Sequence, residues 1–176
     1  MAIEYHLFEN MKILFVGINP HPGSDRRGVP FSNNKMFWYL LSAAGLIQEP
    51  RIELKDDLKL YLIYSERFQH HYSYGVINLI DRPTVSTSEL KRAEAAYGRE
   101  RLIAAIHGYH PTIVCFVGKI TYQLFKAKIQ CSYGWQDPIA SSQIYVMHPP
   151  HRGFAHIRID ELKEIAKYFI GETIEN

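Results

Sequence analysis

Three short polar segments follow apolar runs of the sequence, and they carry the side chains best suited to chemistry. These side chains are Asn19, Asn78 and His148. A carboxamide offers a hydrogen-bond donor and an acceptor side by side but cannot act as a general base, whereas an imidazole can donate a hydrogen bond to a developing negative charge. We therefore expect the chemistry of the protein at these three segments.

Common signatures of other active sites are absent from these segments. The run GINPHPG at residues 17–23 is neither a dinucleotide-binding G-x-G-x-x-G nor a phosphate loop, and no G-x-S-x-G elbow occurs. His148, His151 and His156 are spaced three and five residues apart, but on a loop with two prolines rather than on one helix face. We therefore expect no metal ion and no cofactor.

The elements that position these residues are predicted from apolar runs and helical patterns. Strands are expected at residues 12–18, 74–80, 112–117 and 143–147, and helices from 33 or 34 to 44, from 89 to about 107, at 119–126 and around the apolar stripe Leu162, Ile165, Ala166 and Phe169. Residues 21–31 are expected to form a turn-rich loop, and residues 49–70 show no clear pattern.

Continuously apolar strands that alternate with helices are typical of a parallel sheet covered on both faces. We therefore expect an α/β fold, a three-layer αβα sandwich with a central four-stranded parallel sheet, in a single domain over residues 1–176. In such sheets ligands bind beyond the carboxyl ends of the strands. Because Asn19, Asn78 and His148 lie at the ends of expected strands, we expect them at one edge of the sheet.

Composition limits the class of protein but not its chemistry. The 176 residues are 47% hydrophobic and 22% charged, with a formal net charge of +2, which is typical of a globular domain without a basic tail. No apolar run could span a bilayer and the first ten residues lack a signal-peptide pattern, so we expect a cytoplasmic protein. Cys115 and Cys131 are too few for a disulfide scaffold or an iron–sulfur cluster, and Cys115 is expected to be buried.

Several motif blocks follow one another in order from about residue 12 to residue 170. They are Gly17-Ile18-Asn19-Pro20, Gly28-Val29-Pro30-Phe31, Phe37-Trp38, the run GVINLIDRPT from Gly75 to Thr84, and Val117-Gly118-Lys119. They resemble, in order and spacing, the blocks G-I-N-P-G, G-F-P-F, F-W, G-V-x-x-L-V-D-R-P-T and L-G-K of the uracil-DNA glycosylase superfamily, closest to its mismatch-specific uracil-DNA and thymine-DNA glycosylases.

The resemblance implies a four-stranded parallel sheet between helices, which agrees with the fold predicted from the residues. It implies a monofunctional DNA glycosylase that flips uracil out of the helix and hydrolyses its N-glycosidic bond, which starts base excision repair. The implied partner is uracil-containing DNA, double-stranded and in some members also single-stranded, bound by a monomer without a cofactor. Such a reaction needs a donor for the base oxyanion, a placed water and a slot for the extruded base.

The resemblance also implies roles for individual residues in the base pocket. Asn19 would orient water, Phe31 would stack on the base, and Gly17 and Ile18 would line the base pocket. Asn78 stands where the mismatch-specific enzymes have lysine, and its amide fits the O4 and N3–H edge of uracil. The first two roles have plain structural alternatives, a turn asparagine before proline and a core phenylalanine. Phe37 and Trp38 are expected mainly to pack their helix.

The last motif departs from the mismatch-specific pattern. The run His148-Pro149-Pro150 replaces N-P-S and resembles the H-P-S of broad and single-strand-selective enzymes, in which a neutral histidine donates a hydrogen bond to uracil O2. Arg152 falls where many members insert leucine into the vacated stack, so it would fill that gap and meet phosphate. His151, His156 and Arg158 would add contacts to the DNA backbone, unless they belong to a solvated basic loop.

His21 stands where the mismatch-specific members have glycine. An imidazole beside the base would overlap the methyl group of thymine, so we expect uracil to be preferred, unless His21 points to solvent. The alternative functions are a glycosylase of this fold for hypoxanthine, xanthine or thymine opposite guanine, a damaged-DNA binder that does not cut, and a nucleotide-processing α/β enzyme of another family.

Overall fold

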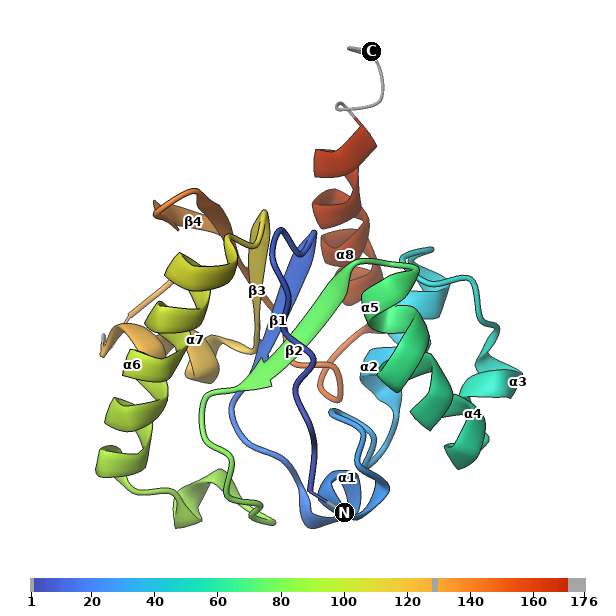
Figure 1. The fold of residues 1–176 in the computed structure, drawn as a ribbon, viewed down its shortest axis with the longest axis horizontal. Coiled ribbons are helices and arrows are strands. Elements are labelled where there is room, and N and C mark those ends of the chain that lie inside the picture. The colour runs from blue at the N-terminus through green and yellow to red at the C-terminus, as the bar shows by residue number, and fades with distance from the viewer. Residues whose placement is uncertain (1, 128–129, 171–176) are drawn as a thin grey trace.

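Five strands form the central sheet of the computed structural model, which describes residues 2–127 and 130–170 (Figure 1). The strands are β1 (Ile13–Gly17), β2 (Tyr74–Asn78), β3 (Ile113–Val117), β4 (Gly134–Ile139) and β5 (Ser142–Met147). Their order across the sheet is β2-β1-β3-β5-β4, and all neighbours are parallel except β4, which runs antiparallel to β5.

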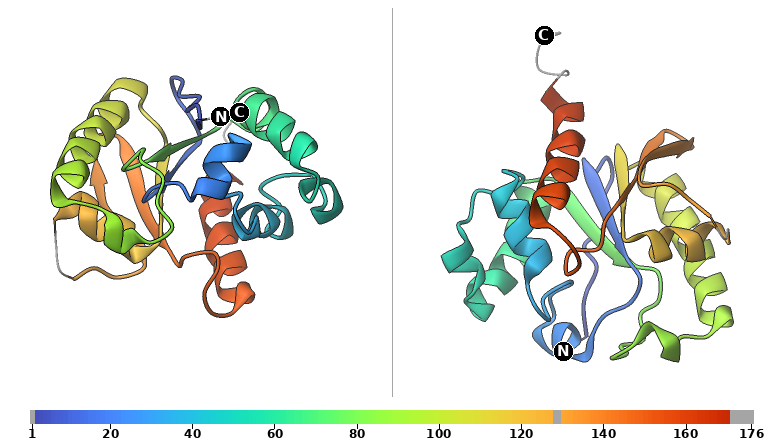
Figure 2. Two further views of the ribbon diagram at one scale, coloured as in Figure 1. Left: turned by 90° about the horizontal axis from the view of Figure 1, so that it is seen from below. Right: turned by 180° about the vertical axis from the view of Figure 1, so that it is seen from behind.

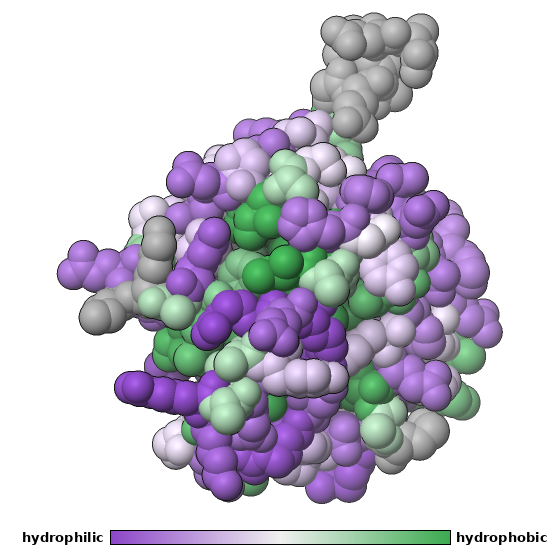
Figure 3. Space-filling view, turned by 60° about the vertical axis from the view of Figure 1, so that its left-hand side comes forward, coloured by the Kyte–Doolittle hydropathy of each residue, from purple (hydrophilic) through white to green (hydrophobic). Residues whose placement is uncertain are grey.

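Helices cover both faces of this sheet, so the molecule has three layers (Figure 2). They are α1 (Pro22–Arg27), α2 (Met36–Ala43), α3 (Arg51–Leu54), α4 (Asp57–Leu62), α5 (Phe68–His70), α6 (Arg92–Tyr109), α7 (Lys119–Lys126) and α8 (Ala155–Ile170), with a π-helical turn at Ile63–Arg67 and a 3-10 turn at Thr87–Glu89. On the face that carries α6 and α7, hydrophilic side chains surround smaller hydrophobic patches (Figure 3).

Alternate residues of each central strand supply the two halves of the core. In β1, Ile13 and Phe15 pack against α2, α5 and α8, whereas Leu14 and Val16 pack against α6 and α7. All four side chains are buried because side chains alternate across a strand and both faces of the sheet are covered. The continuously apolar runs therefore follow from the layered fold, and Cys115 is buried in β3 as expected.

The expectation of a four-stranded sheet is wrong by one strand, because β4 extends the edge beyond β5. Its sequence GWQDPI contains glycine, aspartate and proline, and its side chains alternate between partly buried and exposed. Proline is tolerated at the edge of a sheet, where no further strand needs its missing N–H, and the pairing with β5 is irregular between Gln136 and Ile139. An edge strand of this kind lacks the apolar run that marks the other four.

Two segments without a predicted helix also contain helices. In the expected loop at residues 21–31, Pro22 starts α1, the His21 side chain caps it, and Gly28 ends it with a left-handed φ of 68°. The ambiguous stretch at residues 49–70 forms α3, α4, the π-helical turn and α5. No helix in the described part of the chain has the length and hydropathy to cross a membrane.

Candidate active site

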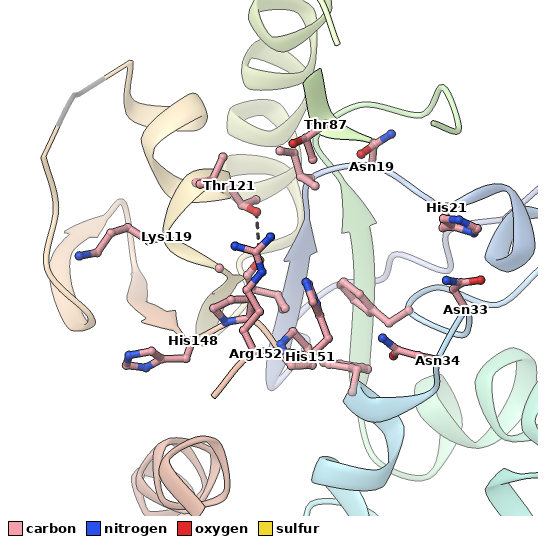
Figure 4. Close-up of a pocket in the computed structure, with 18 of the residues that line it drawn as sticks. Asn19, His21, Asn33, Asn34, Thr87, Lys119, Thr121, His148, His151 and Arg152 are labelled. Atoms are coloured by element: carbon pink, nitrogen blue, oxygen red, sulfur yellow. Dashed lines mark hydrogen bonds between the residues drawn. The ribbon is translucent and has the colours of Figure 1, made fainter. Parts of the chain in front are cut away.

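A cavity of about 730 Å³ lies beyond the carboxyl ends of the parallel strands. Asn19 follows β1, Asn78 ends β2, Gly118 follows β3 and His148 follows β5, and all four line this cavity. Asn19 and His21 lie on one side, whereas Lys119 and His148 lie on the other (Figure 4). The sequence prediction that the polar segments meet at one edge of the sheet is thus confirmed.

Gly17 allows two of the predicted base-binding side chains to approach each other. A Cβ atom at this position would overlap Oδ1 of Asn78 and lie 2.9 Å from the ring of Phe31. The two side chains therefore meet across the bare backbone of Gly17, and any larger residue there would push them apart. Ile18 continues from Gly17 into the cavity wall, next to Asn19.

Contacts at the end of β2 fix the backbone of Asn78 on the side away from the cavity. Its side chain lines the cavity although only 3% of the residue is exposed, and Arg101 donates a hydrogen bond to its backbone carbonyl. Arg101 also pairs with Asp81, which accepts a 2.8 Å hydrogen bond from the Tyr5 hydroxyl. Burial raises the pKa of Tyr5, and the carboxylate of Asp81 raises it further, so this hydroxyl keeps its proton.

The amide of Asn19 has a defined orientation. Its nitrogen donates to the backbone carbonyl of Arg82 over 3.0 Å and to Oγ1 of Thr84 over 2.8 Å. A carbonyl can only accept, so the nitrogen must face this segment and Oδ1 must face away from it. The D-R-P-T block of the sequence thus holds Asn19 so that its oxygen can accept a hydrogen bond from water, which an amide can orient but not deprotonate.

Phe31 forms one wall of the cavity in a strained backbone conformation. Its φ of 56° lies in the left-handed region, which costs a residue with a side chain on the order of 1 kcal/mol. Its ring packs against Phe37, with centroids 4.3 Å apart, and remains only partly buried. Trp38 donates a 2.8 Å hydrogen bond from its indole to the carbonyl of Pro30 and so anchors the loop. Both Phe37 and Trp38 are core residues, as expected.

His21 is fixed at the start of α1 and lines the cavity. Its Nδ1 accepts a 3.0 Å hydrogen bond from the backbone N–H of Gly23. An Nδ1 that accepts this bond carries no hydrogen, so the hydrogen of the ring is on Nε2. The alternative that His21 simply points to solvent does not hold.

His148 has two partners that were not expected. Its Nδ1 lies 3.0 Å from Oε2 of Glu161, and its backbone N–H donates to Oε1 of the same carboxylate over 3.0 Å. The ring of Tyr133 stacks on the imidazole, with centroids 3.5 Å apart and planes at 18°. The contact with Glu161 does not fix the tautomer of the ring, and the expected role of His148 as a neutral donor to the base stays a prediction.

Lys119, the lysine of the Val117-Gly118-Lys119 motif, contacts the same pair of stacked rings. Its Nζ lies 4.4 Å from the centroid of the Tyr133 ring, which is a cation–π contact. Lys119, Tyr133, His148 and Glu161 therefore form one connected group at the far side of the cavity from Asn19.

The expected DNA-contacting residues divide into two groups. Arg152 and His151 are exposed and line the cavity, and the guanidinium of Arg152 reaches across it toward Thr121 (Figure 4). Partial desolvation of the ring at the cavity wall lowers the pKa of His151, and Arg152 and Arg158 lower it further, which favours a neutral ring. His156 is exposed on the first turn of α8, where its ring lies beside Phe154.

The guanidinium of Arg158 is bonded inside the loop, which argues against its expected contact with the DNA backbone. The residue is only 3% exposed, and its guanidinium donates to the backbone carbonyls of Pro149 and Phe154. A Cβ atom on Gly153 would lie 3.3 Å from that group, so the loop closes tightly around it. Arg158 thus shapes the 148–154 loop from within.

Sequence reasoning missed the supporting residues Glu161, Tyr133 and Thr84. Glu161 and Tyr133 come from elements far from His148 in sequence, and no local pattern marks them. Thr84 was quoted as part of a motif, but its bond to Asn19 spans 65 residues. Among the described residues, no group of three or more histidine, cysteine or acidic side chains could hold a metal ion.

The sequence also matches the model of a known protein family, which agrees with the site described above. The model of the uracil DNA glycosylase superfamily matches residues 5–169, which is nearly the whole chain. The matched region includes every strand and every residue of the cavity described above. Membership implies a hydrolytic DNA glycosylase and therefore an enzyme that binds DNA. The chain belongs to the uracil DNA glycosylase superfamily.

Proposed function

We propose that this protein is a monofunctional uracil-DNA glycosylase that flips uracil out of DNA and hydrolyses the bond between the base and the deoxyribose. The observation that carries the proposal is the meeting of Asn19, Phe31, Asn78 and His148 around one cavity at the strand ends. The cavity volume of about 730 Å³ falls in the usual range for small-ligand sites.

The base would lie between Phe31 and the polar end of β2. Stacking of a base on an aromatic ring contributes about 1–3 kcal/mol and suits any base, so it provides affinity rather than choice. Asn78 supports the choice of base, because its amide can pair with the adjacent N–H and carbonyl oxygen of uracil. Cytosine presents a lone pair and an amino group at that edge and would need the amide to face the opposite way.

The reaction would rest mainly on stabilisation of the leaving base. As the bond from C1′ to N1 breaks, its electron pair passes to the base and positive charge develops on the sugar. Asn19 would hold the water that adds to C1′, and the proton this water loses balances the one the released base takes up. His148 would meet the negative charge on the base, the kind of interaction whose loss slows catalysis by about 10²–10³-fold.

The loop from His148 to Phe154 would contact the DNA around the flipped nucleotide. Arg152 is exposed at the cavity, where its guanidinium can reach phosphate or fill the vacated stack. Phe154 and His156 present exposed rings on the same side of the loop. His151 also lines the cavity and stays in the proposed set of DNA contacts, whereas the buried Arg158 would support the loop.

The test is removal of single lesions from oligonucleotides. Oligonucleotides that contain one uracil, hypoxanthine or xanthine, as duplexes and as single strands, and a duplex with one thymine opposite guanine, are incubated with the protein. They are then treated with alkali and analysed for cleavage. Uracil should be removed fastest, and His148→Ala should slow removal by about 10²–10³-fold while DNA binding is retained. Faster removal of another base would identify the alternative glycosylase. Binding of lesion DNA without any cleavage would identify a damaged-DNA binder.

A further inference from the structure

We propose that Tyr5 is a positioning residue that fixes the amide of Asn78 in the orientation that reads uracil and rejects cytosine. This inference rests on the proposed function and names the group that sets its choice of base. Asn78 alone does not set that choice, because a carboxamide turned by half a rotation about its Cβ–Cγ bond presents the opposite pattern, which pairs with cytosine.

The chain on either side of Tyr5 is held in place. The Tyr64 hydroxyl donates to the backbone carbonyl of Glu4, and the rings of His6 and Tyr64 lie 5.3 Å apart. The Tyr5 ring itself packs against the core cluster on the α6 side of the sheet, and the guanidinium of Arg101 lies 5.8 Å from its centroid. The position of the Tyr5 hydroxyl is therefore defined by the fold.

The single hydrogen of the Tyr5 hydroxyl is used by Asp81. The hydroxyl donates to Oδ1 of Asp81 over 2.8 Å, and the guanidinium of Arg101 pairs with the other oxygen of that carboxylate. A carboxylate in such a pair only accepts hydrogen bonds. A phenol that donates its one hydrogen to a carboxylate can therefore only accept from any further partner.

The orientation of the Asn78 amide follows from this arrangement. A hydrogen bond between the Asn78 side chain and the Tyr5 hydroxyl lowers the pKa of Tyr5 against the effect of burial, as a bond donated to the oxygen does. The amide nitrogen must then face Tyr5, which leaves Oδ1 on the side of Gly17 and the Phe31 ring. Asn78 is 3% exposed and Arg101 bonds to its backbone carbonyl, so the end of the strand is fixed as well.

This orientation matches one pyrimidine and opposes the other. One amide hydrogen of Asn78 points to Tyr5, and the hydrogen on the same side as Oδ1 remains for the base. Uracil offers a carbonyl oxygen to that hydrogen and an N3–H to Oδ1. Cytosine would place its amino group against the amide N–H and the lone pair of N3 against Oδ1. Buried polar groups would then be left unpaired, which costs more than the loss of a contact.

Proton NMR tests the orientation without any need for activity. The side-chain amide of Asn78 is assigned by its disappearance from ¹H–¹⁵N spectra of Asn78→Ser, and the Tyr5 ring by its change in Tyr5→Phe. We expect nuclear Overhauser effects between the amide hydrogens and the ring hydrogens next to the Tyr5 hydroxyl. Effects from those amide hydrogens to Gly17 and Phe31, with none to Tyr5, would overturn the proposal.

Binding of DNA that resists cleavage then tests the choice of base. Two duplexes carry one 2′-fluoro-2′-deoxyuridine or one 2′-fluoro-2′-deoxycytidine, in which fluorine disfavours positive charge on the sugar. The modified nucleotide lies opposite an abasic analogue, so neither base loses a pair when it flips. The wild type should bind the uracil duplex more tightly. In Tyr5→Phe, which keeps the ring, the ratio of the two affinities should fall by about 5–10-fold, the usual effect of one lost hydrogen bond.

Two further variants separate orientation from packing. Tyr109→Phe is the matched control and should leave the ratio unchanged, because Tyr109 packs against the same cluster but lies beside Asn10, at the opposite end of the sheet from Asn78. Asp81→Ala frees the hydrogen of the Tyr5 hydroxyl, which can then donate to Oδ1 of a turned amide. The ratio should therefore fall although the hydroxyl is still present, and this variant serves if Tyr5→Phe does not fold.

Equal affinity ratios in Tyr5→Phe and the wild type would overturn the proposal, and so would an equal fall in Tyr109→Phe. A wild type that prefers the uracil duplex but removes none of the four lesions would support the role of Tyr5 and refute the glycosylase. If the wild type prefers neither duplex and removes no lesion, the reading of the base falls together with the proposed function, whatever the NMR contacts.

Discussion

Because Gly17 has no side chain, other side chains can occupy that space, and this determines the shape of the site. Asn78 and Phe31 both approach the position that a Cβ atom would occupy, and Asn78 is almost completely buried. We expect Gly17→Ala to displace one of them, to slow uracil removal by at least about 10-fold and to destabilise the fold by about 1–3 kcal/mol. Cleavage rates and thermal unfolding measure the two effects.

Gly108→Ala is the matched control for Gly17→Ala. Nothing lies within 4 Å of a Cβ atom at Gly108, and the residue is in the last turn of α6. Alanine there should leave the cleavage rate unchanged and stabilise the protein by about 0.5–1 kcal/mol. A Gly17→Ala enzyme as active as this control would mean that Asn78 and Phe31 need not keep their positions.

We expect the ring of His21 to exclude the methyl group of thymine from the cavity. The cap that it forms on α1 holds the ring at the cavity wall. We expect His21→Gly to gain activity on thymine opposite guanine and to retain activity on uracil. Glycine is tolerated as a helix cap at a cost of only a few tenths of a kcal/mol, so the variant should fold. His21→Asn keeps a capping oxygen on a smaller side chain and should give an intermediate gain. No change in the ratio of thymine to uracil removal would show that His21 does not control access.

At the scale of elements, the segment that follows β2 holds Asn19, which follows β1. Thr84 is buried and bonds to both sides of the Asn19-Pro20 turn, through its Oγ1 to Asn19 and through its backbone N–H to the carbonyl of Pro20. Thr84→Val keeps the shape but removes the acceptor for the Asn19 amide. We expect cleavage about 5–10-fold slower, which corresponds to one lost hydrogen bond of about 1 kcal/mol. Thr84→Ser keeps the hydroxyl and should remain close to the wild-type rate; a serine variant as slow as valine would point to packing instead.

Two arginines at the 148–154 loop have different expected roles. Arg152 is exposed, whereas Arg158 is buried on two carbonyls of the loop. Arg152→Gln should weaken DNA binding and reduce the slope of log K against log salt by about 1, as expected for one lost phosphate contact. Arg158→Gln should lower the melting temperature and the cleavage rate but leave that slope unchanged. Equal salt slopes for Arg152→Gln and the wild type would remove Arg152 from the phosphate contacts.

The elements that sequence patterns predicted are those with a strong local signal. The four parallel strands are apolar runs that end in polar residues, and α6, α7 and α8 have apolar residues at helical spacing. Strand β4 has no such run because it lies at an edge. Helix α1 was interpreted as a loop because its proline and glycines, which start and end it, are also the residues of turns.

At the scale of the whole molecule, the candidate site could be predicted only as far as its motifs reach. Asn19, Asn78 and His148 stand at strand ends, so the parallel sheet brings them together. Glu161 and Tyr133 are placed by the packing of α8 and of the segment before β4 around β5, which no single stretch of sequence encodes. For the same reason the burial of Arg158 could not be foreseen, since an arginine in a basic loop gives no local sign of which carbonyls it will meet.

The last prediction also concerns the whole molecule, which we expect to work without a metal ion. The residues around the cavity carry amides, imidazoles, hydroxyls, cations and apolar or aromatic groups, and no group of acidic, histidine or cysteine ligands gathers anywhere in residues 2–127 and 130–170. Hydrogen bonds and charge can stabilise the leaving base without a Lewis acid. The rate of uracil removal should therefore be unchanged after dialysis against excess chelator. A loss of activity that added Mg²⁺ or Zn²⁺ restores would contradict this prediction and would require ligands that the cavity does not display.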